Sequence, residues 1–167
     1  MAQLPCNLPG RAHNGVMLYL CFKYLHVFLA ITAVGFNISY AVWIRRATNS
    51  PDHLDFALRG IKFMDDRIAN PCYIGLAITG IGLAQLGRLP LTTPWIVGAL
   101  GLLLLALGMA YGGYTPSLTR QIRILSERGA TSEEYRRQAR RSTQWGISLA
   151  VVVVLILVLM IFKSSIL

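Results

Sequence analysis

Four long apolar stretches divide this chain, and polar or charged segments separate them. The stretches cover residues 16–44, 68–86, 95–115 and 145–162. A helix that crosses the hydrocarbon core of a bilayer needs about 20 mostly apolar residues, with a range of roughly 17–25, and all four stretches reach that length. The pattern predicts an all-α, polytopic membrane protein: a four-transmembrane-helix bundle in a single membrane domain over residues 1–167.

Residues at the ends of these stretches indicate where each helix begins or ends. Trp43, Trp95 and Trp145 lie at stretch ends, where an amphipathic indole ring prefers the headgroup layer. Further end signals are Arg45-Arg46 after the first stretch, Asn70-Pro71 at the start of the second and Lys163 after the fourth. We therefore expect long loops at residues 45–67 and 116–144.

The first long loop contains a helix signal of its own. Ser50-Pro51-Asp52 is typical of a helix start, and apolar residues follow it at spacings of four, three and three: Leu54, Leu58, Ile61 and Met64. This spacing predicts an amphipathic helix. It lies either along the inner membrane surface or against an extension of the third apolar helix.

The second long loop is expected to form a helical hairpin. Residues 117–128 contain neither Gly nor Pro and keep apolar residues at helical spacing, so the third helix should continue past the membrane. Gly129 should end it. Ser132, followed by Glu133 and Glu134, is typical of a capped, acidic helix start that leads into the fourth apolar stretch.

Composition supports a lipid environment and explains the net charge. Hydrophobic residues make up 54% of the chain, charged residues 14%, and the mean hydropathy is +0.53, which lies outside ordinary soluble usage. The formal charge of +9 does not indicate a nucleic-acid partner, because the basic residues lie between apolar runs. We expect membrane lipids and other membrane protein subunits as partners, and no nucleic acid.

The basic residues also predict an orientation. Twelve Lys and Arg lie in the two long loops, whereas only Arg11, Arg88 and Lys163 flank the opposite ends of the helices. Lys and Arg in short loops resist export, so the long loops should be cytoplasmic. The chain is expected to be a multi-pass protein of the bacterial inner membrane, with both termini on the periplasmic side.

Polar residues inside a membrane are the natural candidates for function, and the first apolar stretch carries most of them. Lys23, His26 and Asn37 share one helical stripe with two alanines, and this stripe should face the bundle. The imidazole of His26 could be an axial ligand of haem b, a proton carrier, or simply a hydrogen-bonded packing residue. His13 and His53 lie in segments on opposite sides of the membrane, so a bis-histidine haem within one chain is not expected.

Small residues in the second and third stretches predict close helix packing. Gly75 and Gly80 lie in the second stretch, and Gly108 and Gly112 form a GxxxG motif in the third. We expect these glycines to pack within the bundle, with dimerisation as the alternative. The fourth stretch is different because residues 151–162 have no polar side chain, so it should contact lipid or another protein.

Charged clusters near the membrane surface have simpler interpretations. Residues of the last loop cover one helical side and suit anionic lipid headgroups or an acidic partner: Arg136, Arg137, Arg140 and Arg141. Asp65, Asp66 and Arg67 are expected to pair locally or with this cluster rather than to bind a metal. The three cysteines have no metal-ligand spacing, so no metal site is predicted.

The run from Tyr19 to Val27, followed by Gly35, resembles the bacterial membrane proteins grouped as domain of unknown function 2269. Further motifs of that family's layout are Phe63–Arg67 before Pro71, Thr93-Pro94-Trp95, and Glu134–Arg137. The likeness covers the chain from Leu18 to Lys163. It implies a four-helix membrane protein and supplies no established activity.

A more distant resemblance is to the HemJ type of protoporphyrinogen oxidase and the CopD copper-resistance proteins. Their Lys-x-x-His in the first helix is similar to Lys23 and His26, and in HemJ that histidine is associated with haem. The third apolar stretch lacks the Lys and His that HemJ carries there. We therefore expect a non-catalytic subunit that stabilises a larger membrane complex, for example an energy-transducing one. The alternative is a haem-associated redox protein that uses His26.

Overall fold

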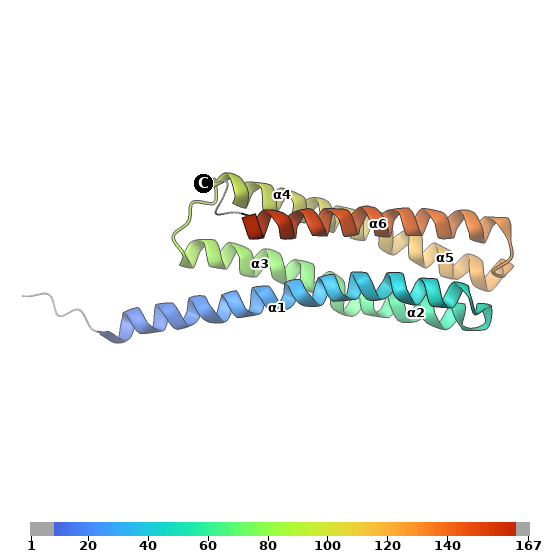
Figure 1. Ribbon diagram of the computed structural model, residues 1–167, viewed down its shortest axis with the longest axis horizontal. Coiled ribbons are helices and arrows are strands. Elements are labelled where there is room, and N and C mark those ends of the chain that lie inside the picture. The colour runs from blue at the N-terminus through green and yellow to red at the C-terminus, as the bar shows by residue number, and fades with distance from the viewer. Residues whose placement is uncertain (1–8, 163–167) are drawn as a thin grey trace, which may run out of the picture.

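The computed structural model describes residues 9–162, which form an elongated bundle of four helical rods joined by short turns (Figure 1). The elements are α1 (Pro9–Thr48), a 3-10 turn (Pro51–His53), α2 (Leu54–Met64), η2 (Asp65–Ala69), α3 (Asn70–Leu86), α4 (Pro94–Met109), η3 (Ala110–Tyr114), α5 (Thr115–Arg128) and α6 (Glu133–Phe162). Each rod is long and apolar enough to cross a membrane. The predicted all-α, four-helix membrane architecture is confirmed, and Lys163 lies outside the described residues.

The rods are longer than predicted because the long loops are mostly helical continuations of the membrane helices. The predicted start at Asn70-Pro71 coincides with the first residues of α3, but α2, η2 and α3 follow one another without a break, so the second rod begins at Leu54. The third rod likewise runs from α4 through η3 into α5, as expected for residues 117–128. Within the predicted loops at 45–67 and 116–144, the expected helical segments continue the membrane helices, and turns lie around residues 49–53 and 129–132.

Two five-residue π-helical segments, η2 and η3, let the second and third rods pass through a proline. The N–H of Asn70 bonds to the carbonyl of Asp65, and the N–H of Thr115 bonds to the carbonyl of Ala110. A proline follows each of these donors directly. A proline ring inside a regular α-helix collides with the carbonyl of the preceding turn, and the wider π-turn displaces that carbonyl.

The turn between α5 and α6 follows the predicted caps. Gly129 ends α5 with a φ of 76°, a backbone conformation that glycine adopts without steric cost. The Ser132 hydroxyl oxygen then accepts the N–H of Tyr135 at 3.2 Å, as an N-cap residue does.

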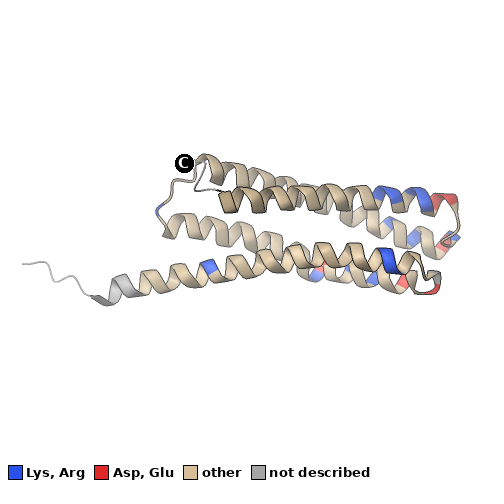
Figure 2. Cartoon of the chain, viewed as in Figure 1, with Lys and Arg blue, Asp and Glu red and all other residues tan. Residues whose placement is uncertain are grey.

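The bundle has two halves with different contents. Figure 2 shows that most charged side chains gather toward the end with the α1–α2 and α5–α6 turns. We call this end the charged half; it comprises α2, α5, residues 40–48 of α1 and residues 133–145 of α6. The remainder, with α3, α4 and most of α1 and α6, is the apolar half, in which α1 packs on α3 and α4 packs on α6.

The charged half has a continuous core. Leu58 and Ile61 of α2 pack with Leu118 of α5, and all three side chains have no exposed surface. Of the two positions predicted for the helix in the first loop, the structure therefore has the one against the extension of the third helix. A helix collinear with α3 does not lie along the membrane surface.

Candidate functional site

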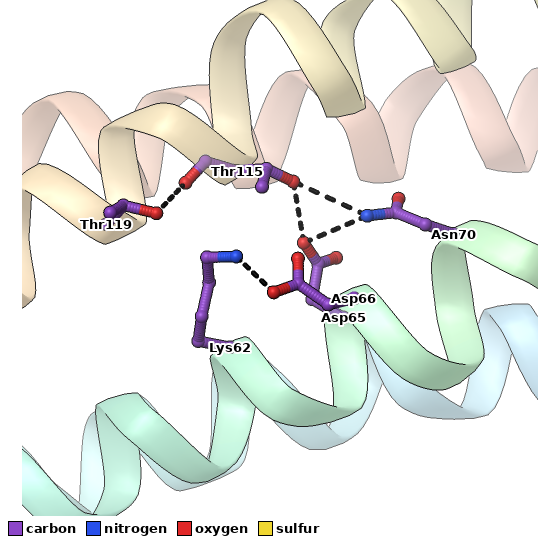
Figure 3. Close-up of polar contacts among 6 residues, drawn as sticks. All are labelled: Lys62, Asp65, Asp66, Asn70, Thr115 and Thr119. Atoms are coloured by element: carbon purple, nitrogen blue, oxygen red, sulfur yellow. Dashed lines mark hydrogen bonds and ion pairs between the residues drawn. The ribbon is translucent and has the colours of Figure 1, made fainter.

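A buried acidic side chain lies where the two π-helical segments meet, at the boundary between the two halves. Asp65 in η2 is only 2% exposed. Its Oδ2 accepts a hydrogen bond from the Thr115 hydroxyl at 2.7 Å and a longer one from Asn70 Nδ2 at 3.3 Å (Figure 3). We call Asp65, Asn70 and Thr115 the Asp65 cluster. It connects the α2–α3 rod to the α4–α5 rod through polar contacts.

No cation forms an ion pair with Asp65 within the described part of the chain. The closest candidate, Lys62, instead pairs with Asp66 one turn away on the outside of the rod (Figure 3). The predicted local pairing therefore holds for Asp66. It is wrong for Asp65, because the π-turn directs this carboxylate into the bundle, where only neutral donors reach it.

Tyrosine side chains from three helices surround the cluster. Tyr40, Tyr73 and Tyr114 are each at most 4% exposed, and Tyr40 and Tyr114 belong to the same buried cluster as Ala69 of η2. Asn37 Nδ2 donates to the Tyr73 hydroxyl oxygen at 2.6 Å. The predicted residue Asn37 thus belongs to the polar surroundings of the cluster.

This arrangement of side chains has two capabilities. Burying a carboxylate among neutral groups is costly unless hydrogen bonds compensate. The bond from Thr115 fastens the two rods at their π-turns, and the bond from Asn70 compensates the carboxylate within its own rod. An ionisable group of this kind can also hold or release a proton. The first capability is structural, and the second is chemical.

The structure places His26 and Lys23 away from this cluster. His26 Nδ1 lies 2.8 Å from the Thr79 hydroxyl of α3, and a Cβ added to Gly80 would come within 3.3 Å of the imidazole ring. The imidazole ring of His26 is therefore packed in the contact between α1 and α3. Lys23 is exposed on the outside of α1.

The predicted packing glycines fall into two groups. A Cβ at Gly75 would meet the Leu29 side chain of α1 at 2.8 Å, so Gly75 and Gly80 both lie at the α1–α3 contact. A Cβ at Gly108 or Gly112 would meet nothing within 4 Å. The expectation that this GxxxG motif packs within the bundle is wrong, because the buried face of α4 carries alanines, including Ala106, which pack against α6.

The arginines of α6 lie on the surface of the charged half. All four are exposed: Arg136, Arg137, Arg140 and Arg141. Arg137 pairs with Glu133 one turn earlier, and the other three form no ion pair with any described residue. The predicted fourth apolar stretch packs on the bundle through Leu149, Val152 and Val153, with Ile156 also packed against these clusters, while other side chains such as Val151, Val154 and Ile161 are exposed.

Sequence reasoning missed the Asp65 cluster although a signal for it exists. Asn70 and Thr115 are polar residues inside predicted helical segments, and each directly precedes a proline. A polar residue at such a position marks a turn where the backbone departs from α-helix and a side chain can reach across. That signal identifies the two π-segments but not that they face each other.

Comparison with known proteins gives one match. A family model described as "Predicted integral membrane protein (DUF2269)" matches residues 20–164. No curated protein and no solved structure matches the chain.

Proposed function

The chain belongs to the DUF2269 family of predicted integral membrane proteins, and from this premise we propose that it is a non-catalytic subunit of a larger membrane complex. In this proposal it binds an apolar helix face of another subunit, and the contact lies at the charged half. The residues that carry the proposal are on α2, outside the thickness of the hydrocarbon core.

The observation that carries the proposal is an exposed aromatic face of α2. Phe56 is 78% exposed and Phe63 is 63% exposed, although both belong to the half with a packed core. They lie seven residues apart and therefore share one side of the helix. Gly60 lies between them, and a Cβ added there would meet nothing within 4 Å, so a second helix could approach closely.

Hydrocarbon alone does not account for this face, and Phe63, 23 residues before Leu86 and so roughly 35 Å away, is at the level of the headgroup layer. The rod formed by α2, η2 and α3 is continuous, and Phe56 lies 30 residues before the end of α3 at Leu86. At about 1.5 Å per residue this is roughly 45 Å, whereas the hydrocarbon core is about 30 Å thick and the whole bilayer about 40–45 Å. A large exposed apolar side chain at this depth is typical of a protein interface.

The Asp65 cluster has a supporting role in this proposal. It fixes the α2–α3 rod against the α4–α5 rod at the boundary of the two halves, so the aromatic face of α2 keeps a defined position relative to the membrane. Pre-organised surfaces bind more tightly because less freedom is lost on association.

The orientation of the chain in the membrane is also part of the proposal, and it rests on the distribution of the basic residues. Figure 2 places the basic side chains mostly at the end with the α1–α2 and α5–α6 turns. The positive-inside rule then assigns the charged half to the cytoplasm and both termini to the periplasmic side of a bacterial inner membrane. The partner face on α2 would therefore be cytoplasmic.

A matched pair of variants tests the partner face. The wild type is purified in mild detergent, and the complex it forms is measured by size and subunit stoichiometry. F56A/F63A should weaken that complex at least tenfold, because buried aromatic anchors dominate interface energies. F28A is the control, since Phe28 is 53% exposed on the apolar half of α1. It should leave the complex intact.

Three outcomes would overturn this function. A wild-type chain that is a lone monomer in mild detergent would contradict it. So would a complex that F56A/F63A leaves unchanged, provided that both variants melt at the wild-type temperature. A complex that contains only copies of this chain would show a homodimer instead of a subunit role.

The alternative function, a haem-associated redox protein that uses His26, stays a prediction. Its ligands would have to come partly from another chain, since His26 lies in the α1–α3 contact. A stoichiometric Soret band in the purified complex that is lost in His26→Ala would support it. A complex without such a band would exclude it.

A further inference from the structure

Two shallow, open hollows adjoin on the surface of the charged half, one along α5 and the other between α2 and α5. The first has a volume of about 410 Å³ and is lined by Pro116, Thr119, Arg120 and Arg123. The second, of about 300 Å³, is lined by Arg59, Lys62, Thr119 and Ile122. Because Thr119 lines both, the hollows adjoin, and we call them together the basic groove.

The charges in the groove are unequally balanced. Arg59 is held by Asp55 at 2.7 Å, and Lys62 pairs with Asp66. Arg120 and Arg123 form no ion pair with any acidic side chain of the described residues. They lie three residues apart on α5 and so share one side of the helix. The first hollow therefore presents two guanidinium groups with no acidic partner.

The depth of the groove matches a phospholipid headgroup. Arg120 lies 25 residues after Trp95 along the continuous rod of α4, η3 and α5, and Trp95 begins the apolar half. This separation corresponds to roughly 37 Å along the helix axis. It exceeds the hydrocarbon thickness of about 30 Å and remains within the 40–45 Å that includes both headgroup layers.

We propose that the basic groove is a binding site for the phosphate group of an anionic phospholipid, held by Arg120 and Arg123. A planar guanidinium binds phosphate oxygens through two parallel hydrogen bonds, which favours arginine at such positions. Thr119 donates its own hydroxyl to the Thr115 carbonyl, so it shapes the floor between the hollows and does not compete for the phosphate. The site is independent of the partner face on α2.

The face of the rod beyond the groove fits the rest of the lipid. Above Pro116, toward the apolar half, Gly108 and Gly112 leave open space, and Leu105 is 50% exposed. An acyl chain lying on these glycines would have its phosphate at the level of Arg120. A soluble phosphate or phosphorylated metabolite would gain nothing from this apolar continuation, so the lipid is the occupant that the arrangement favours.

A comparison of two charge-matched double variants tests the site. The protein is purified in detergent, and the number and type of retained lipids are measured by native mass spectrometry, followed by titration with phosphatidylglycerol. R120Q/R123Q should bind phosphatidylglycerol about 30-fold more weakly, because each cation near an anionic headgroup contributes about a five-fold gain in affinity. R45Q/R46Q removes the same charge from exposed positions of α1, outside the groove, and should bind like the wild type.

Each other outcome would overturn the proposal. Equal losses in both double variants would mean that net surface charge, not the groove, attracts the lipid. A wild type that binds phosphatidylcholine as tightly as phosphatidylglycerol would exclude selection of an anionic lipid. Displacement of the lipid by millimolar inorganic phosphate would show a site for a free anion. The comparison requires that both variants melt at the wild-type temperature. We expect this because all four substituted arginines are exposed.

Discussion

The charged half and the apolar half of this bundle bury different kinds of side chain. The charged half buries large ones: Leu58, Ile61 and Leu118 have no exposed surface. In the apolar half the side chains with the least exposed surface are small, such as Ala33 at 1% and Ala106 at 0%, although Leu149 is also buried, and Leu104 is 68% exposed. The two halves thus differ in the size of the side chains that they bury most completely.

The surrounding solvent explains the difference. In water, burial of apolar surface stabilises a fold by about 25 cal/mol per Å², so large apolar side chains collect in a core. In lipid this driving force disappears, and helices associate through small residues that allow close contact. We therefore expect the membrane boundary near the place where the packing changes, which is where the Asp65 cluster lies.

The largest effect should come from truncating a leucine in the charged half. Leu118→Ala leaves a cavity in a closed core and should lower the free energy of unfolding by about 2–5 kcal/mol. Leu104→Ala removes the same atoms from a lipid-facing position and should change it by less than about 0.5 kcal/mol. Reversible unfolding in mixed detergent micelles measures both. Equal losses would show that the two halves do not differ.

A smaller but still large effect is expected at the boundary. Asp65→Ala leaves the Thr115 hydroxyl and the Asn70 amide without their acceptor and should cost about 1.5–3 kcal/mol. Asp66→Ala removes only an exposed pair with Lys62 and should cost less than about 1 kcal/mol. The same unfolding assay applies. A neutral Asp65→Ala would mean that the cluster does not fasten the rods.

The glycines offer a third comparison within one rod. A Cβ at Gly113 would lie 2.6 Å from the Trp145 ring, so Gly113→Ala should destabilise the protein by about 1–2 kcal/mol through overpacking. Gly108→Ala meets nothing and should stabilise the isolated chain by up to about 1 kcal/mol, because alanine is the better helix former. Thermal unfolding of the purified chain separates these opposite signs. If both alanine variants lost stability by similar amounts, the position of Gly108 would not be open.

The smallest effect concerns the surface of the charged half. Arg137 and Glu133 are 78% and 69% exposed, so their ion pair should contribute at most about 0.5 kcal/mol. A double-mutant cycle with Arg137→Ala and Glu133→Ala measures this coupling. A coupling above 1 kcal/mol would indicate a covered surface, such as an interface with another protein.

Much of the fold could be predicted from the sequence because it depends on local properties. Apolar length alone predicts four crossings, and the bias of Lys and Arg separates one end from the other. The stop at Gly129 and the cap at Ser132 were also predictable, since each satisfies backbone groups within one turn. The continuity of the second rod before Pro71 was not predicted, because a π-turn removes the steric conflict that usually separates two helices at a proline.

The candidate functional residues were harder to predict than the fold, because they depend on which residues lie close together in space. The Asp65 carboxylate and the Thr115 hydroxyl are 50 residues apart in sequence, and no local pattern relates them. Likewise, the glycines at positions 108 and 112 look like packing residues, but the rotation of α4 turns them outward.

The sequence by itself determined that this protein crosses a membrane with four helices and where its charged end lies, because lipid acts on each segment independently of the others. Only the tertiary structure decided which faces of those helices meet, that two π-turns enclose Asp65, and that Phe56, Phe63 and the basic groove stay uncovered. Side-chain contacts between rods depend on their rotation and register, and neither is encoded within a single segment.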